Sequence, residues 1–158
     1  MKGIKKIKIL IYGYGNPGRQ DDGLGILFSE AMEEWAKQNG IKGITCDSNY
    51  QLNAEDSQSM SENDIVIFAD ATKNKIRNIK YKEIKPGKII SFSTHSMSPE
   101  SVLALCKELY NSKPRTYLIT IKGYRWAVNG EVTKKARENL DKALEYIKKF
   151  ILIKSYVD

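Results

Sequence analysis

Histidine and cysteine are scarce in this chain. Its 158 residues include one histidine, His95, and two cysteines, Cys46 and Cys106. A single histidine excludes the HExxH metalloproteases and histidine-rich zinc sites, and two cysteines are too few for a Cys-rich zinc module or a disulfide framework. The low cysteine content is typical of a reducing compartment, and we therefore expect a cytoplasmic protein.

The chain also lacks a long hydrophobic run. Its longest apolar stretches, such as residues 65–69, are far too short to cross a bilayer. The N-terminal segment is basic and then apolar, but the apolar part stops at Gly13 without a small-residue cleavage site. We interpret this segment as a first strand, and we expect no membrane partner.

No run of five or more basic residues occurs, although the net charge is +7. Residues 1–72 hold 7 basic and 11 acidic side chains, whereas residues 73–158 hold 19 basic and 8 acidic ones. A basic half can contact nucleic acid or an acidic protein surface. Because the lysines are scattered, we favour a solvated surface that keeps the protein soluble, and we expect no nucleic-acid partner.

The chain does show a regular alternation of strand and helix patterns. Apolar residues make up 41% of it and charged residues 28%, which is typical of a folded domain. The predicted strands cover residues 7–12, 44–47, 64–69, 79–84, 88–93 and 116–121. The predicted helices cover residues 23–39, 53–60, 98–109 and 133–150, with Ser98 and Thr133 as caps. The prediction is one α/β domain over residues 1–158, with a mostly parallel sheet covered by helices on both sides.

Chemically active side chains follow three of the predicted strands. Asp22 lies in the glycine-rich loop after the first strand, Asp70 follows residues 64–69, and His95 follows residues 88–93. Because ligands bind at the carboxyl ends of such strands, we expect these three side chains to converge if the strands are neighbours. Two carboxylates and one imidazole suit Ni, Zn, Fe or Mn rather than Cu(I). The same trio also suits acid and base roles in hydrolysis.

Each of these residues also has a purely structural interpretation when it is taken alone. Asp22 can be an N-cap anion, Asp70 can bind loop amides, and His95 can be a turn residue. Their joint placement at three strand ends favours a site. The hydroxyl residues beside His95 form no readable Ser-His-Asp arrangement, so a serine nucleophile is not favoured.

The glycine-rich loop matches a second pattern as well. Gly13, Gly15 and Gly18 have the G-x-G-x-x-G spacing of a dinucleotide-binding loop. Asp21 and Asp22 would then lie where a pyrophosphate should meet bare helix amides, so we discount a nucleotide site. The glycines are better interpreted as backbone that turns tightly and lets a partner chain approach.

Four segments in order carry a resemblance to a known family. Residues 13–25, GYGNPGRQDDGLG, resemble the G-x-G-N…D-[DE]-G-x-G signature of hydrogenase maturation endopeptidases. The other three similar segments are Gln51-Leu52 with Glu55, FADAT at 68–72 and STHSMSPE at 93–100. These proteases remove a C-terminal extension from the [NiFe] hydrogenase large subunit once nickel has been inserted. The resemblance spans nearly the whole chain and implies a twisted five-stranded sheet between helices.

The resemblance also implies roles for individual residues. An aspartic-type endopeptidase is expected, whose substrate is the nickel-loaded large-subunit precursor. The family's metal-contacting positions map onto Asp22, Asp70 and His95, which are expected to bind the substrate's nickel and to carry catalysis. Some family members have glutamate at the position of Asp22. The residues expected to receive the extended peptide are Gly13, Asn16 and Gly23. No permanently bound cofactor is expected, and Cd or Zn can stand in for nickel.

Two other functions stay open from the sequence. Peptidyl-tRNA hydrolase has a related α/β fold and opens with a G-x-G-N-P-G loop, which residues 13–18 match. Its catalytic histidine should follow that loop closely, where this chain has Asp21-Asp22-Gly23. The second alternative is a non-catalytic, nickel-dependent binding module for the same precursor, because no nucleophile is identifiable. The sequence predicts neither the oligomeric state nor a role for residues 123–131.

Overall fold

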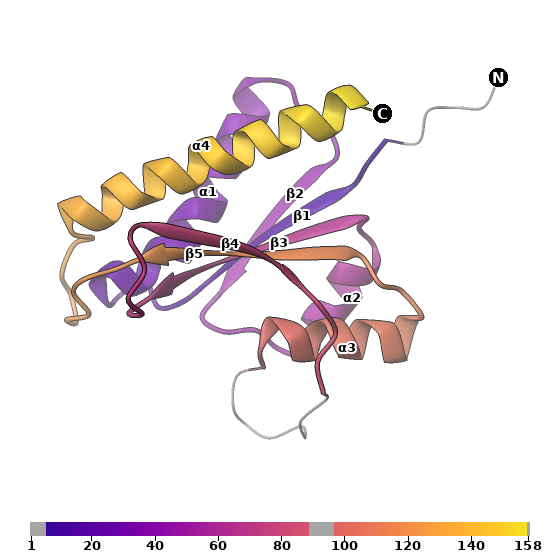
Figure 1. Ribbon diagram of the computed structural model, residues 1–158, viewed down its shortest axis with the longest axis horizontal. Coiled ribbons are helices and arrows are strands. Elements are labelled where there is room, and N and C mark those ends of the chain that lie inside the picture. Colours follow the sequence, from indigo (N-terminus) through magenta and orange to yellow (C-terminus); the bar gives the residue numbers. More distant parts are fainter. Residues whose placement is uncertain (1–5, 89–96, 158) are drawn as a thin grey trace.

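The computed structural model describes residues 6–88 and 97–157, which form an α/β fold (Figure 1). The strands of this part are β1 (Ile9–Tyr14), β2 (Ile44–Asn49), β3 (Ile65–Thr72), β4 (Ile79–Ile84) and β5 (Arg115–Lys122). They form one sheet in the order β2-β1-β3-β5-β4. β4 runs antiparallel to β5, and all other neighbours are parallel. The predicted α/β class and mostly parallel five-stranded sheet are confirmed.

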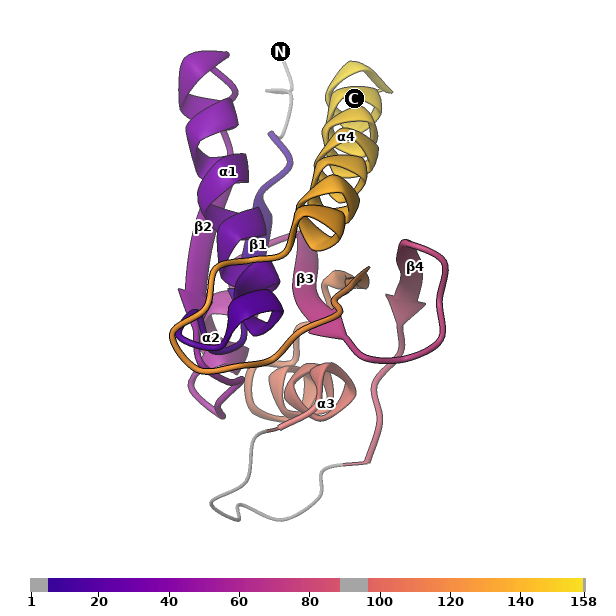
Figure 2. The ribbon, with the colours of Figure 1, turned by 90° about the vertical axis from the view of Figure 1, so that its left-hand side faces the viewer.

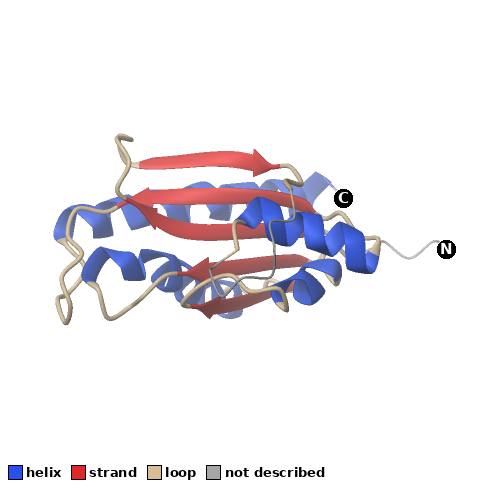
Figure 3. Ribbon diagram, turned by 90° about the horizontal axis from the view of Figure 1, so that it is seen from below, coloured by secondary structure: helices blue, strands red, loops and turns tan. Residues whose placement is uncertain are grey.

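Helices cover both faces of this sheet (Figure 2). The helices of the described residues are α1 (Leu24–Gln38), α2 (Asp56–Ser61), α3 (Pro99–Tyr110) and α4 (Lys134–Val157), with a 3-10 turn, η1 (Gln20–Gly23), directly before α1. α1 and α4 lie on one face, and α2 and α3 lie on the other. Figure 3 shows the strands with helices in front of and behind them. This three-layer arrangement leaves the carboxyl ends of β1 and β3 free to carry a site.

Alternate residues of the central strands fill two separate cores. Ile11 and Ile67 point toward α1 and α4, whereas Leu10 and Phe68 point toward α2 and α3. All four side chains are buried. Strands that are covered on both faces need apolar residues at consecutive positions, which explains the continuous apolar runs of β1 and β3.

The two predicted helix caps are confirmed. The Ser98 hydroxyl accepts a hydrogen bond from the Ser101 amide at 3.1 Å, and the Thr133 hydroxyl accepts one from the Ala136 amide at 3.3 Å. The N-cap interpretation of Asp22 is wrong, because α1 begins after Gly23 without any side-chain cap. The Asp22 carboxylate is therefore engaged elsewhere.

Among the observed strands, only β4 has the predicted bounds. β2 ends two residues later and β3 three residues later than predicted, so that Asp70 lies within β3, and β5 is longer by one residue at each end. β1 begins at Ile9 and extends to Tyr14, two residues later at each end than predicted, because the first glycine of the loop still pairs with β2 and β3. Of the strand predicted over residues 88–93, only Lys88 is described, and it lies outside any strand. In the part of the chain that the structure describes, no helix combines the length and apolar character needed to span a bilayer.

Candidate active site

Asp22 and Asp70 come together at the carboxyl edge of the sheet. Asp70 lies near the end of β3. Asp22 lies in η1, just after the glycines of the loop that follows β1. Burial, with a smaller contribution from the nearby charge of Asp22, raises the pKa of Asp70 to about 7. The two carboxyls therefore form an electrostatically coupled pair, as the strand-end pattern predicted.

The glycine-rich loop holds Asp22 through its own backbone. The amide of Asn16 donates a hydrogen bond to Asp22 Oδ2 at 3.0 Å. The side-chain oxygen of Asn16 accepts one from the Gly18 amide at 2.9 Å. Asn16 thus both closes the loop and fixes the orientation of the Asp22 carboxylate.

The glycines of this loop allow close backbone packing. A Cβ atom on Gly13 would overlap the carbonyl oxygen of Gly25, and a Cβ atom on Gly25 would overlap that of Ala69. Gly23 is buried against Pro17. The start of α1 therefore sits directly on β1 and β3, which brings η1 and Asp22 next to Asp70. Peptide binding by Gly13, Asn16 and Gly23 stays a prediction.

Tyr14 is a site residue that the sequence analysis missed. Its hydroxyl hydrogen-bonds the Asp70 carboxyl. Burial raises the pKa of Tyr14 strongly, and the charges of Asp70 and Glu100 add to this effect. The phenol therefore stays protonated and donates its hydrogen to Asp70. Tyrosine at the end of a strand is so common that its pattern gave no signal of this contact.

Asp21 has a structural role that differs from that of its neighbour. Its carboxylate is completely buried and accepts hydrogen bonds from the amides of Tyr124 (2.7 Å), Arg125 (3.1 Å) and Thr133 (2.8 Å). The Thr133 hydroxyl donates a fourth at 2.8 Å. Burial opposes ionisation, but these hydrogen bonds outweigh it and lower the pKa of Asp21. Asp21 is therefore an ionised anchor and not a catalytic acid.

The segment over residues 123–131, for which the sequence gave no role, packs against the glycine-rich loop. The side-chain oxygen of Gln20 accepts a hydrogen bond from the Ala127 amide at 2.9 Å, and its nitrogen donates one to the Glu131 carbonyl at 3.1 Å. The Asn129 amide donates to the Gly18 carbonyl at 2.9 Å. Together with the hydrogen bonds of Asp21, these contacts hold the segment against the glycine-rich loop and η1.

The third residue of the predicted trio, His95, lies outside the described residues. The described residues contain no group of three His, Cys, Asp or Glu side chains that could hold a metal ion. The structure thus brings Asp22 and Asp70 together, and the convergence of His95 with them stays a prediction. The two carboxylates supply oxygen ligands, and an imidazole would complete a donor set of borderline hardness.

Comparisons with known proteins place this fold among solved structures. No family model matches the sequence, and no curated protein matches it. A [NiFe] hydrogenase maturation protease, HycI from Thermococcus kodakarensis KOD1, superposes with a TM-score of 0.70 at 23% identity, over 91% of this chain and 92% of that one. The hydrogenase maturating endopeptidase HybD from E. coli superposes with a TM-score of 0.65 at 18% identity, over 89% and 90%.

The chain has the fold of the hydrogenase maturation proteases. The resemblance carried by the four sequence motifs is therefore confirmed at the level of the fold. In this hydrogenase maturation protease fold, Asp70 lies near the carboxyl end of β3 and Asp22 lies in η1, after the loop that follows its parallel neighbour β1. At these identities the likeness concerns the fold, and the chemistry has to be argued from the chain's own residues.

Proposed function

We propose that this chain is a processing endopeptidase that removes the C-terminal extension of a [NiFe] hydrogenase large-subunit precursor. The observation that carries the proposal is the coupled pair of carboxyls, Asp22 and Asp70, at the carboxyl edge of the sheet. The fold supports it, because the solved structures that this chain resembles are named as hydrogenase maturation proteases. Both cysteines are free, which suits the reducing cytoplasm as the site of action.

In this proposal, nickel arrives as part of the substrate. Asp22 and Asp70 supply carboxylate oxygens and His95 an imidazole nitrogen, which is a donor set that suits Ni²⁺ and its surrogates Cd²⁺ and Zn²⁺. A positive ion beside the two carboxyls would relieve their mutual repulsion. Binding would therefore be strongest when the precursor already carries its metal, and insertion of nickel would be tested before cleavage.

The carboxyls also supply the acid and base chemistry. Asp70 can accept a proton from an attacking water and return it to the leaving amine. Without a metal the pKa of Asp70 is about 7, and nickel at the site would lower this pKa and keep the carboxylate ionised. Tyr14 holds the Asp70 carboxyl in place through its hydroxyl. Asp22, fixed by the Asn16 amide, provides the second carboxylate at a set position. The two carboxyls orient the scissile peptide beside Asp70. The peptide is not bound covalently to the enzyme in this mechanism.

The test is incubation of the protein with nickel-loaded and nickel-free precursor, followed by intact-mass measurement. Loss of a C-terminal peptide from the nickel-loaded precursor alone is the expected result. Asp22→Ala, Asp70→Ala and His95→Ala should each abolish it. Wild-type activity in any two of these variants would end the proposed roles. Complex formation without a mass change would instead indicate a non-catalytic binding module, and hydrolysis of a peptidyl-tRNA ester would indicate the other alternative.

A further inference from the structure

The two edges of the sheet differ in how they are protected against pairing with another chain. β4 carries Lys80 and Lys82 along its length, and Lys85 follows it. Charged side chains of this kind discourage an added strand. β2, at the opposite edge, has the sequence ITCDSN, without lysine, arginine or proline. Among the described residues, no strand pairs with its outer side. This edge is therefore open to a further strand.

The backbone of β2 presents hydrogen-bonding groups to that outer side. The carbonyls of Gly43 and Asn49 both accept hydrogen bonds from β1 or from the loop that follows it. Backbone groups alternate in direction along a strand, so the odd-numbered residues face β1. Ile44, Cys46 and Ser48 consequently turn their amides and carbonyls away from the sheet, and the Ser48 amide donates a hydrogen bond to Asp47 Oδ1 at 2.8 Å. The amides of Ile44 and Cys46, with the carbonyls of all three residues, match the backbone of an extended peptide.

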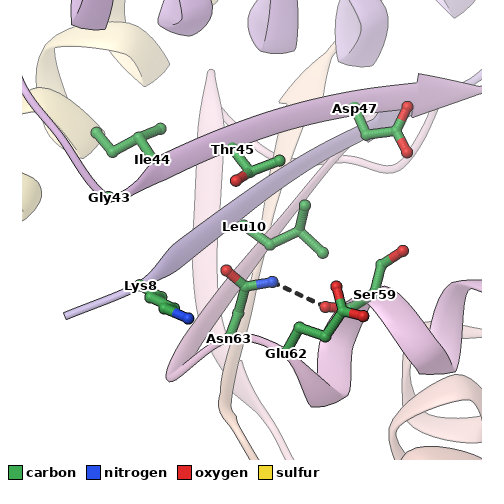
Figure 4. A pocket seen from close by; sticks show the side chains of 9 residues that line it. All are labelled: Lys8, Leu10, Gly43, Ile44, Thr45, Asp47, Ser59, Glu62 and Asn63. Atoms are coloured by element: carbon green, nitrogen blue, oxygen red, sulfur yellow. Dashed lines mark hydrogen bonds between the residues drawn. The ribbon is translucent and has the colours of Figure 1, made fainter.

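A groove of about 380 Å³ lies beside this edge, on the face of the sheet that α2 covers (Figure 4). Thr45 and Asp47 of β2 line one side, and Glu62, just after α2, lies across from them. Lys8 also lines the groove, so its lining carries two carboxylates and one ammonium group. Because alternate side chains of an added strand would point into this groove, its charge favours a lysine or arginine there.

The end of this edge leads to the candidate active site. The Asn49 carbonyl accepts a hydrogen bond from the Gly15 amide at 3.2 Å. The next residue of the loop, Asn16, holds Asp22 through its amide at 3.0 Å. A peptide that follows β2 to its last residue therefore arrives beside the loop that carries Asp22.

We propose that the outer edge of β2 binds the extended C-terminal segment of the precursor by strand addition, with a lysine or arginine of that segment in the groove between Asp47 and Glu62. This rests on the proposed function, which supplies an extended peptide as substrate. Strand addition gives affinity through main-chain hydrogen bonds, and the groove gives selectivity. Strand addition along β2 delivers the scissile bond to the carboxyl edge of the sheet without any sequence-specific contact at Asp22 or Asp70.

The first test compares proline variants at the two edges. Cys46→Pro removes an outward amide of β2, and Glu83→Pro is the matched control, because Glu83 lies on the edge strand β4 at a position whose amide also points outward. With nickel-loaded precursor, Cys46→Pro should raise KM about tenfold with kcat unchanged. Glu62→Lys, which reverses the charge in the groove and leaves the backbone intact, should raise KM in the same way. Wild-type KM in both variants would overturn the proposal.

A second measurement does not depend on cleavage. Hydrogen exchange of the wild-type amides is followed by NMR, with and without a synthetic peptide that spans the cleavage site and the extension. The expected result is slower exchange at the amides of Ile44 and Cys46, and unchanged exchange along β4. Unprotected amides at these two positions with saturating peptide would overturn strand addition, as would a dimer that Cys46→Pro dissociates. Protection of β2 without cleavage of any precursor would overturn the proposed function alone.

Discussion

The Tyr14 hydroxyl donates a hydrogen bond to the Asp70 carboxyl, and this bond joins the ends of two neighbouring parallel strands. Burial and the charge of Asp22 raise the pKa of Asp70, hydrogen bonds from the Ala71 backbone and from Tyr14 oppose this, and the resulting pKa is about 7. The carboxyl therefore changes its protonation state near neutral pH. It is poised both to take a proton from water and to bind a cation.

Removal of the Tyr14 hydroxyl should raise the pKa of Asp70. In Tyr14→Phe, the carboxylate loses a hydrogen bond that favours its charged form, so its pKa should rise from about 7 by about one unit. The measurement is a ¹³C NMR titration of the Asp70 carboxyl. Tyr110→Phe, at an exposed tyrosine on α3, is the control and should leave the titration unchanged. An unchanged or lowered pKa in Tyr14→Phe would contradict the assigned contact.

The buried charge of Asp70 should also make stability depend on pH. Its pKa is about 7 in the folded protein against an ordinary value of 3.8. Between pH 3.8 and about pH 7, Asp70 therefore keeps its proton in the folded state and is ionised in the unfolded chain. The destabilisation is complete above pH 7, where it reaches about 4 kcal/mol, and it disappears as the pH falls toward 4.

Asp70→Asn should consequently be more stable than wild type at pH 8, and this advantage should shrink steadily toward pH 4. Urea unfolding in the presence of a chelator measures it, because a bound cation would mask the effect. Asp141→Asn, at an exposed position of α4, should show no such pH-dependent gain. If Asp70→Asn proves no more stable than wild type at pH 8, the buried charge does not carry this penalty.

The sequence predicted that Asp22 and Asp70 lie close together, and the physical reason is clear. The apolar run before Asp70 marks a strand buried on both faces, and the glycines before Asp22 mark a tight turn after another such strand. Carboxyl ends of parallel neighbours share an edge, so the two aspartates had to be close. His95 follows a segment outside the described residues, and its position stays a prediction.

The rest of the site depends on contacts between distant parts of the chain. Asp21 binds the backbone amides of Tyr124 and Arg125, more than a hundred residues away, in a segment without any helix or strand pattern. Main-chain partners leave no trace in side-chain periodicity, so the role of residues 123–131 was not predictable. For the same reason, the paired aspartates of the loop looked equivalent, although Asp21 is an anchor and Asp22 faces Asp70.

Loss of the Asp21 carboxylate should destabilise the fold strongly. Asp21→Ala leaves the amides of Tyr124, Arg125 and Thr133 without their buried acceptor, which costs about 3–5 kcal/mol. Urea unfolding at pH 7 measures this loss against the control Asp141→Ala. Because the folded pKa of Asp21 is depressed, its contribution is present above about pH 4 and is lost as the pH falls through the folded value. A loss below about 1 kcal/mol would contradict the anchoring role.

Substitution of Gly13 distinguishes a packing role from peptide binding. A Cβ atom at this position would overlap the Gly25 carbonyl. This carbonyl belongs to the backbone, so it cannot move away by a change of side-chain rotamer. Gly13→Ala should therefore push α1 away from β1 and destabilise the protein by about 3 kcal/mol or more. Gly40→Ala is the control, since Gly40 has open space around it and only a positive φ of 61°. Its loss should be about 1 kcal/mol. Urea unfolding of both variants gives the comparison. A Gly13→Ala protein with wild-type stability and weakened precursor binding would show that Gly13 contacts the peptide and does not pack the helix.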